Sequence, residues 1–247
     1  MARTPYTQEK VLDDVMRSAV AEFVAAKDRF DVEGRTYIPG GWFYRIRRWV
    51  QGWTVPERGW TATFPSKFVE LTIPFSDVTF TASKAQPMTI DCRMIVSGTF
   101  NYYTDDERSD QAVQRTMERS DEYACREMMG NLFAPRSCQI GSLPLIVATE
   151  GKNRVALFKV HKRPMRNMVA ATAYPDASDL TIHRSWPCKI YSLRYRQRRR
   201  VLPLPDAVLP ILKAYGVRSS QSSMFSIQDY LDLRRARADL CNFQMGE

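Results

Sequence analysis

The stretch that decides the fold class is MTIDCRMIVSGTFNYYTDDE, residues 88–107. As far as Tyr103 it is rich in Ile, Val, Thr, Phe and Tyr, a composition typical of β-strands. Thr104 to Glu107 then match the capping box, in which a Thr and a Glu three residues later open a helix. A strand block that leads into a capped helix, expected to end near Met129, indicates an α+β fold rather than alternating β-α-β units.

On either side of this stretch the sequence predicts helical ends and further strands. Apolar residues recur every three or four positions over residues 8–30, which predicts an amphipathic N-terminal helix. The remaining elements are two C-terminal helices, near 206–215 and from Ser226 onward, and strands over 68–74, 77–82, 138–149, 154–160 and 190–195. Residues 138–160 are expected to form a hairpin around the turn at 150–153. The predicted fold is α+β: a mostly antiparallel sheet core, the N-terminal amphipathic helix, one capped central helix and C-terminal helices.

The charge is distributed unevenly along the 247 residues, whose net charge is +9. Residues 1–150 carry 18 basic and 20 acidic side chains, whereas residues 151–247 carry 18 basic and 7 acidic ones, a net charge of +11. The C-terminal part is therefore where a polyanion would bind. We expect a single domain over residues 1–247. Only this change in charge suggests a division near 150, into a near-neutral α+β part and a basic part.

Cysteine usage and hydropathy indicate the compartment. The chain has five cysteines, an odd number without CxxC spacing, which is typical of free thiols in a reducing compartment. No apolar run approaches the roughly 20 residues of a transmembrane helix. The first ten residues, MARTPYTQEK, do not resemble a signal peptide. We expect an intracellular protein of the cytoplasm, a virion or an organelle matrix, not secreted and without a transmembrane segment.

Recognisable motifs for catalysis, metal binding or nucleotide binding are absent from the sequence. The two histidines, His161 and His183, have no HExxH or CxxC…H spacing, and no phosphate-binding loop or GxSxG motif occurs. Two weaker candidates are Cys188 paired with His183, and the acidic group at 105–110. Helix capping explains that acidic group, because negative charge is favoured at a helix N-terminus. We therefore predict no catalytic residue, no metal and no cofactor.

The densest basic run is KIYSLRYRQRRR, residues 189–200. Because alternate residues of a strand share a face, one extended strand would line up the guanidinium groups of residues 194, 196, 198 and 200. That geometry suits a phosphate backbone, with Tyr191 and Tyr195 available for base stacking. A second basic segment, HKRPMR at 161–166, is expected to join the same surface. The predicted nucleic-acid-binding residues are Lys162, Arg163, Arg166, Lys189, Arg194, Arg196, Arg198, Arg199 and Arg200.

Another unusual stretch is GWFYRIRRWVQGW, residues 41–53, in a region of Gly and Pro that is expected to be rich in loops. Here aromatic residues alternate with arginines. Trp, Tyr and Arg are the residue types that most often anchor protein interfaces. The predicted protein-interface residues are Trp42, Phe43, Tyr44, Arg45, Arg47, Arg48, Trp49 and Trp53.

These patterns favour a non-enzymatic structural subunit of a large nucleoprotein assembly, similar to a viral coat or nucleocapsid subunit. It would bind nucleic acid non-specifically through its Arg-rich C-terminal surface. Residues 41–53 and the terminal helices would contact copies of itself or other subunits. The alternative is an accessory or scaffold subunit of a cytosolic or organellar multiprotein complex, in which the Trp- and Arg-rich segments contact only protein. An enzyme without a short motif is a third hypothesis.

Overall fold

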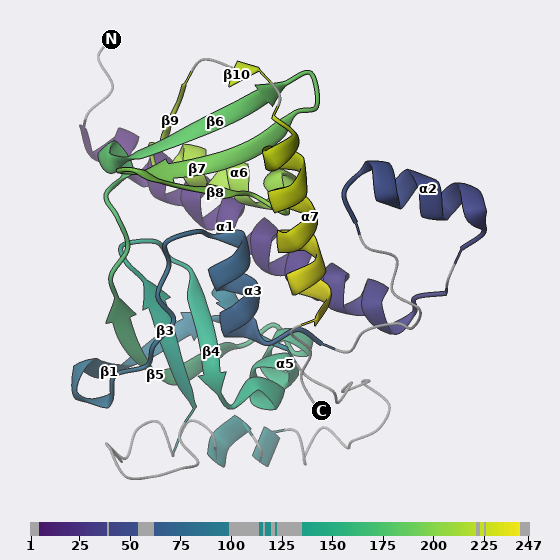
Figure 1. The fold of residues 1–247 in the computed structure, drawn as a ribbon. Coiled ribbons are helices and arrows are strands. Elements are labelled where there is room, and N and C mark those ends of the chain that lie inside the picture. Colours follow the sequence, from purple (N-terminus) through teal and green to yellow (C-terminus); the bar gives the residue numbers. More distant parts are fainter. Residues whose placement is uncertain are drawn as a thin grey trace.

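The computed structural model describes residues 5–38, 40–53, 62–98, 114–115, 117–119, 122, 135–220, 223–224 and 226–242. Within these residues the chain forms two five-stranded sheets and several helices, so the predicted α+β class is confirmed. Figure 1 shows β6–β8 at one end of the molecule and β1–β5 at the other, with the long helix α1 crossing at the level between them. Both sheets are mixed, and their longest strand pairs are antiparallel.

The first sheet has the strand order β1-β5-β3-β4-β2. Its strands are β1 (Ala85–Asp91), β2 (Ile95–Val96), β3 (Arg136–Ile140), β4 (Ile146–Glu150) and β5 (Pro164–Thr172), with the 3-10 turns η1 (Ala82–Lys84) and η2 (Cys92–Met94) flanking β1. β1 pairs with β5 and β3 with β4 in antiparallel fashion, whereas β3–β5 and β2–β4 are parallel. Ile146, Val147 and Ala148 are all buried, as expected for a strand covered on both faces.

The second sheet is built around a three-stranded antiparallel meander, β6 (Leu180–Trp186), β7 (Ile190–Tyr195) and β8 (Arg198–Val201). The short strands β9 (Arg218–Ser219) and β10 (Ser223–Met224) both pair in parallel with the other edge of β6. The 3-10 turn η3 (Ala177–Asp179) leads into β6. β8 therefore lies at the outer edge of this sheet in the part of the chain that the structure describes.

Helix α1 (Pro5–Arg35) links the two sheets. Val20, Phe23 and Val24 are buried on one face, at the spacing that the amphipathic pattern predicts. This helix packs against α6 (Pro205–Ala214), which lies behind β7 and β8 in Figure 1, and against η2 beside the first sheet. α7 (Ile227–Asn242) packs on α3 (Pro65–Thr72) and on β7 and β8. One continuous cluster of buried apolar side chains includes residues of both sheets.

The same helix carries a buried ion pair, Lys27 with Asp31, one helical turn apart. Lys27 is fully buried, and its ammonium group also donates to the carbonyl of Ser97 at 3.3 Å. The other carboxylate oxygen of Asp31 accepts the backbone N–H of Thr63 at 3.1 Å. Burial lowers the pKa of Lys27 and raises the pKa of Asp31, because both charged forms lose hydration. The pair joins α1 to the segments around residues 63 and 97.

Two predicted strands are helices instead. Residues 68–74 fall mostly in α3, where Pro65, Phe68, Val69 and Thr72 are buried at the spacing of a helix and Pro occupies the first turn. Residues 154–160 form α5 (Lys152–Val160), which begins after the left-handed Gly151. The hairpin turn lies within 141–145 rather than at 150–153. Short apolar runs do not distinguish a strand from a buried helix, and this ambiguity explains both errors.

The capped helix expected over 104–129 lies largely outside the described residues. Residues 114–115, 117–119 and 122 are described within it, and they are helical. Met117 is buried and belongs to the core cluster. The strand expected at 77–82 is not formed in the described structure: residues 77–81 pair with no strand and Ala82 begins η1. Residues 190–195 form β7, and the two C-terminal helices are α6 and α7, as predicted.

Candidate nucleic-acid interface

The Arg-rich run folds into a hairpin. β7 ends at Tyr195, the chain turns at Arg196 and Gln197, and β8 begins at Arg198. Arg196 adopts the left-handed conformation, with φ of 54°, which a tight reversal of this kind requires. The single extended strand expected from the sequence is therefore wrong: the chain reverses in the middle of the run.

Strand pairing divides the arginines between two faces of the sheet. Arg194 lies opposite Arg199, and Leu193 opposite Arg200. Directly opposed residues of an antiparallel pair share a face. Arg198 and Arg200 thus project on the face that buries Leu193, at the outer edge of β8, whereas Arg194 and Arg199 project on the other face. The positive charge gathers around the turn and edge of the hairpin instead of along one face.

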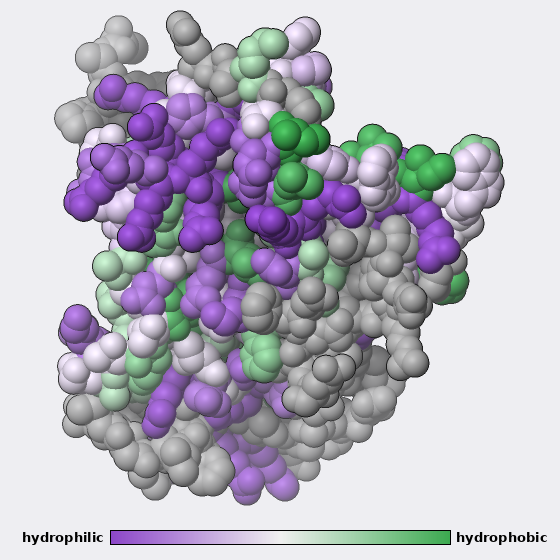
Figure 2. All heavy atoms as spheres, viewed as in Figure 1, coloured by the Kyte–Doolittle hydropathy of each residue, from purple (hydrophilic) through white to green (hydrophobic). Residues whose placement is uncertain are grey.

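No acidic residue occurs between Leu180 and Pro205, a segment that contains seven basic side chains. Figure 2 shows the resulting strongly hydrophilic surface over β6–β8. Arg199 forms an ion pair with Asp229. The other arginines of the hairpin form no ion pair with a carboxylate of the described chain. Arg194 donates to the carbonyl of Arg196 at 2.9 Å, a neutral partner that leaves the charge uncompensated. The exposed guanidinium groups that are open to an anion are those of Arg194, Arg196, Arg198 and Arg200.

Arg199 has a structural role. Its guanidinium makes a two-pronged contact with Asp229 of α7, at 3.1 Å for each prong, and its Nε donates to Ser192 Oγ at 2.7 Å. Asp229 is only 5% exposed and also accepts a hydrogen bond from Ser185 Oγ at 2.7 Å. The pair fixes the first turn of α7 on the sheet. Because Asp229 neutralises the charge of Arg199, the repulsion between Arg199 and its cross-strand neighbour Arg194 is weaker.

His183 lies on the same face as this pair, opposite Ser192. Its Nδ1 is 2.7 Å from Ser220 Oγ, so the structure gives it a partner other than the suggested Cys188. Burial lowers the pKa of His183, and the nearby charges of Arg199 and Arg194 lower it further. Both effects favour the neutral form of the imidazole. Cys188 itself is exposed on the turn before β7.

The two tyrosines expected to stack on bases are half-buried. Tyr195 packs on Phe75, with ring centroids 5.5 Å apart, and Arg196 lies 5.1 Å from its ring. Tyr191 belongs to the core's outer shell and has Arg184 at 5.9 Å from its ring. The exposed groups of the hairpin are thus guanidinium groups rather than aromatic faces, an arrangement suited to phosphates.

The second basic segment lies elsewhere. Lys162 follows α5, and Arg166 is on β5, opposite Thr89 of β1 in the first sheet. Arg163 donates to Gln114 Oε1 at 2.8 Å. Figure 1 places α5 and β5 at the end of the molecule away from β6–β8. Lys162, Arg163 and Arg166 therefore do not extend the basic surface of the hairpin.

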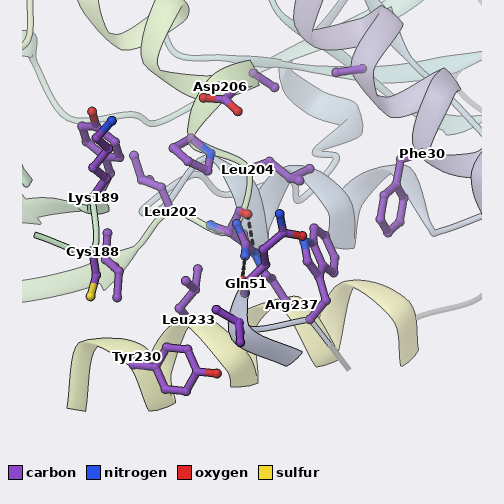
Figure 3. A pocket seen from close by; sticks show the side chains of 18 of the residues that line it. Phe30, Gln51, Cys188, Lys189, Leu202, Leu204, Asp206, Tyr230, Leu233 and Arg237 are labelled. Atoms are coloured by element: carbon purple, nitrogen blue, oxygen red, sulfur yellow. Dashed lines mark hydrogen bonds between the residues drawn. The ribbon is translucent and has the colours of Figure 1, made fainter. Parts of the chain in front are cut away.

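Lys189 lies just before the start of β7, at the opposite end of that strand from the hairpin turn. It precedes β7 after the turn that contains the cis Trp186–Pro187 bond, and it is exposed. Its side chain borders a cavity of about 890 Å³ between α1, the end of α2 (Trp42–Val50), β7 and α7 (Figure 3). Leu202, Leu204 and Leu233 give this cavity an apolar wall. The sequence offered no signal for it, because its lining comes from five distant segments.

Arg237 lies at the centre of the cavity wall. It donates from Nε to the carbonyl of Pro203 at 2.9 Å and from Nη1 to the carbonyl of Gln51, and it stacks on Trp53 at 4.7 Å. Figure 3 shows the bonds to both carbonyls as dashed lines. Burial lowers the pKa of Arg237 to about 10. This arginine ties α7 to the end of α2 and to the β8–α6 connection.

The predicted interface residues of 41–53 separate into two groups. The segment expected to be loop-rich contains a helix, α2, which Arg48 holds to Glu33 of α1, while Trp53 just after the helix packs on Phe30 of α1. The exposed residues are Trp42, Phe43, Arg45, Arg47 and Trp49, together with Ile46 and Val50, which the sequence reasoning missed. Helical spacing of apolar residues at 42, 46, 49 and 50 was the signal that could have identified them.

Comparisons with known proteins add no functional information. The chain matches no protein-family model, and neither the search of curated proteins nor that of solved structures found a match. Among the described residues, no three His, Cys, Asp or Glu side chains come together as a metal site. The acidic group at 105–110 lies outside those residues. None of the helices that the structure describes is long and apolar enough to cross a membrane.

Proposed function

We propose that this protein binds nucleic acid without sequence preference through the β7–β8 hairpin, as a non-enzymatic structural subunit of a large nucleoprotein assembly. The observation that carries the proposal is the group of exposed arginines at residues 194, 196, 198 and 200, which lack a carboxylate partner in the described structure, within a segment free of acidic residues. Guanidinium groups bind phosphate oxygens in a two-pronged geometry.

The spacing on β8 supports phosphate binding. Arg198 and Arg200 are two residues apart on one face of an edge strand. Alternate residues of an antiparallel strand are about 6.8 Å apart. At this separation both guanidinium groups can contact one phosphate backbone at the same time. Because the edge is exposed, a phosphate backbone can run along it without displacing another part of the described chain.

The subunit role adds a second contact surface. The exposed apolar side chains of α2 lie on a different element from the basic hairpin. A protein with one surface for a polyanion and a separate exposed apolar surface can contact nucleic acid and a second partner, another subunit or a membrane, at the same time. The proposal thus assigns the two unusual stretches of the sequence to two separate contacts.

The test is fluorescence anisotropy of a labelled single-stranded RNA at salt concentrations from about 50 to 200 mM, the range over which phosphate contacts lose much of their affinity. The variant changes Arg194, Arg196, Arg198 and Arg200 to Gln. The slope of log affinity against log salt should fall by about 0.7 for each lost phosphate contact. Several RNA sequences should bind with similar affinity.

A matched control changes Lys162, Arg163 and Arg166 to Gln, since these residues lie at the other end of the molecule. It should leave the slope almost unchanged. Absence of binding by the unmodified protein at low salt would refute the proposal. So would an equal effect of the hairpin variant and the control, because the affinity would then follow net charge alone.

A further inference from the structure

Helix α2 presents its apolar side outward. Trp42, Ile46 and Trp49 recur at helical spacing on one side, next to Phe43 and Val50, and each of the five side chains is about half or more exposed. Arg48, by contrast, is only 7% exposed. An amphipathic helix on a globular protein normally buries its apolar stripe and exposes its charges. In α2 the apolar side is exposed and one charged side chain, Arg48, is buried, whereas Arg45 and Arg47 are exposed beside the apolar side.

Contacts of Arg48 hold α2 with its apolar side facing outward. Its Nη1 donates to Glu33 Oε1 and to Tyr44 Oη, both at 2.9 Å. Its guanidinium also lies 5.2 Å from the ring of Trp53 and 5.9 Å from that of Tyr37. Turning the apolar side toward the body would break these contacts and separate Arg48 from Glu33. The outward orientation of the apolar side is thus fixed by specific packing.

The start of α7 continues this surface. Tyr230 Oη donates to the carbonyl of Trp49 at 2.6 Å, and the Arg234 guanidinium lies 5.8 Å from the Trp49 ring. Met224 and Ile227, just before and at the start of α7, are exposed as well. Figure 2 shows apolar surface over α2 and over the start of α7 in the same view. Exposed apolar side chains gathered on two neighbouring elements in this way mark an interaction site.

The charges around the patch favour an anionic partner. No acidic residue occurs from Gly34 to Pro56, whereas Arg45 and Arg47 are exposed on α2 itself. Arg234 lies at the junction with α7. Two copies meeting through α2 would bring these arginines together, and like charges would oppose the contact. A bilayer containing anionic lipid would attract them instead.

We propose that α2 lies in the interfacial layer of an anionic lipid bilayer, with its apolar side among the acyl chains and Arg45 and Arg47 on the lipid phosphates. Tryptophan and arginine are well suited to this layer, since an indole ring and a long cationic side chain each have an apolar body and a polar end. A strongly amphipathic helix with basic residues beside its apolar face is typical of such binding. The inference goes beyond nucleic-acid binding and does not depend on it.

The test is co-sedimentation of the full chain with vesicles of phosphatidylcholine, alone or mixed with phosphatidylserine. The mixed vesicles should bind the protein and shift its tryptophan emission to the blue. Changing Trp42, Phe43 and Trp49 to Ala should reduce binding by about tenfold or more, because most of the inserted apolar area is lost. Changing Arg45 and Arg47 to Gln should reduce binding to the mixed vesicles by about fivefold for each arginine.

A control on a distant element is Met88→Ala, because Met88 is an exposed apolar residue (43% exposed) on β1, in the first sheet. This control should bind vesicles as the unmodified protein does. Urea midpoints should stay close to that of the unmodified protein, because the changed side chains are exposed; the Trp49 change also removes ring contacts with Tyr230 and Arg234 of α7. A failure of the unmodified protein to bind mixed vesicles would overturn the proposal.

Two other outcomes would also overturn it. Binding that survives the α2 changes but disappears when residues 194, 196, 198 and 200 become Gln would assign the lipid contact to the hairpin. If the protein did not bind vesicles, and if the α2 substitutions changed its oligomeric state, the patch would be a protein-binding surface. The nucleic-acid proposal would stand in either case, because its salt series uses no lipid.

Discussion

Arg198 and Arg199 are neighbours on β8, yet replacing each with glutamine should affect different properties of the protein. Arg198 is exposed and has no carboxylate partner among the described residues. Arg199 is bound to Asp229 through both prongs of its guanidinium and to Ser192. Arg198→Gln should therefore weaken nucleic-acid binding, whereas Arg199→Gln should weaken the fold.

The size of each effect follows from the surroundings. Loss of one phosphate contact should lower the salt slope for a single strand by about 0.7. Arg198→Gln should leave the free energy of unfolding within about 0.5 kcal/mol of the original, as is usual for exposed positions. Arg199→Gln leaves the buried carboxylate of Asp229 with Ser185 as its remaining side-chain partner. We expect a loss of about 1–3 kcal/mol, toward the lower end because Arg199 is 38% exposed.

Two measurements separate the outcomes: urea unfolding followed by circular dichroism, and the anisotropy salt series at a temperature where both variants are folded. Arg199→Lys is a useful companion, since it keeps the charge but loses the two-pronged geometry. It should be destabilised with an unchanged salt slope. If Arg198→Gln and Arg199→Gln lowered the slope equally and left the urea midpoint unchanged, the assignment of binding and structural roles would be refuted.

Three further predictions concern buried groups. Asp31→Ala should lower the free energy of unfolding by about 3–5 kcal/mol in urea titrations, because it leaves the fully buried Lys27 unpaired; replacing both residues with apolar ones of similar size should recover much of the loss. Burial, followed by the charges of Arg199 and Arg194, lowers the pKa of His183 in the folded protein from its ordinary value of 6.5. Just below pH 6.5 the unfolded chain therefore binds more protons than the folded protein, so the free energy of unfolding should fall as the pH drops below 6.5. His183→Gln should flatten this part of the stability–pH curve, and an unchanged curve would contradict the assignment. Burial raises the pKa of the thiols of Cys138 and Cys241 to about 11, so a thiol reagent should modify Cys188 in the native protein and reach the buried Cys92, Cys138 and Cys241 only after unfolding.

The sequence alone determined the features that depend on local patterns. Residues 8–30 had the apolar spacing of α1, and the Pro and Gly signals around 205–216 marked α6. The concentration of arginine in 189–200, without an acidic residue nearby, was also evident from the sequence. Each of these features rests on neighbours within a few positions along the chain, where periodicity, capping and charge density are informative.

Tertiary structure decided the roles of individual residues. Arg199 differs from Arg198 only because Asp229, thirty residues further along, returns to bind it. Arg48 faces the body, and the apolar side of α2 faces outward, because Glu33 and Trp53 contact the Arg48 guanidinium. Residues 68–72 became a helix because the core accepts Phe68 and Val69 on one helical face. These outcomes depend on contacts between distant segments, and such contacts can override local preferences because they determine which side chains lose their contact with water.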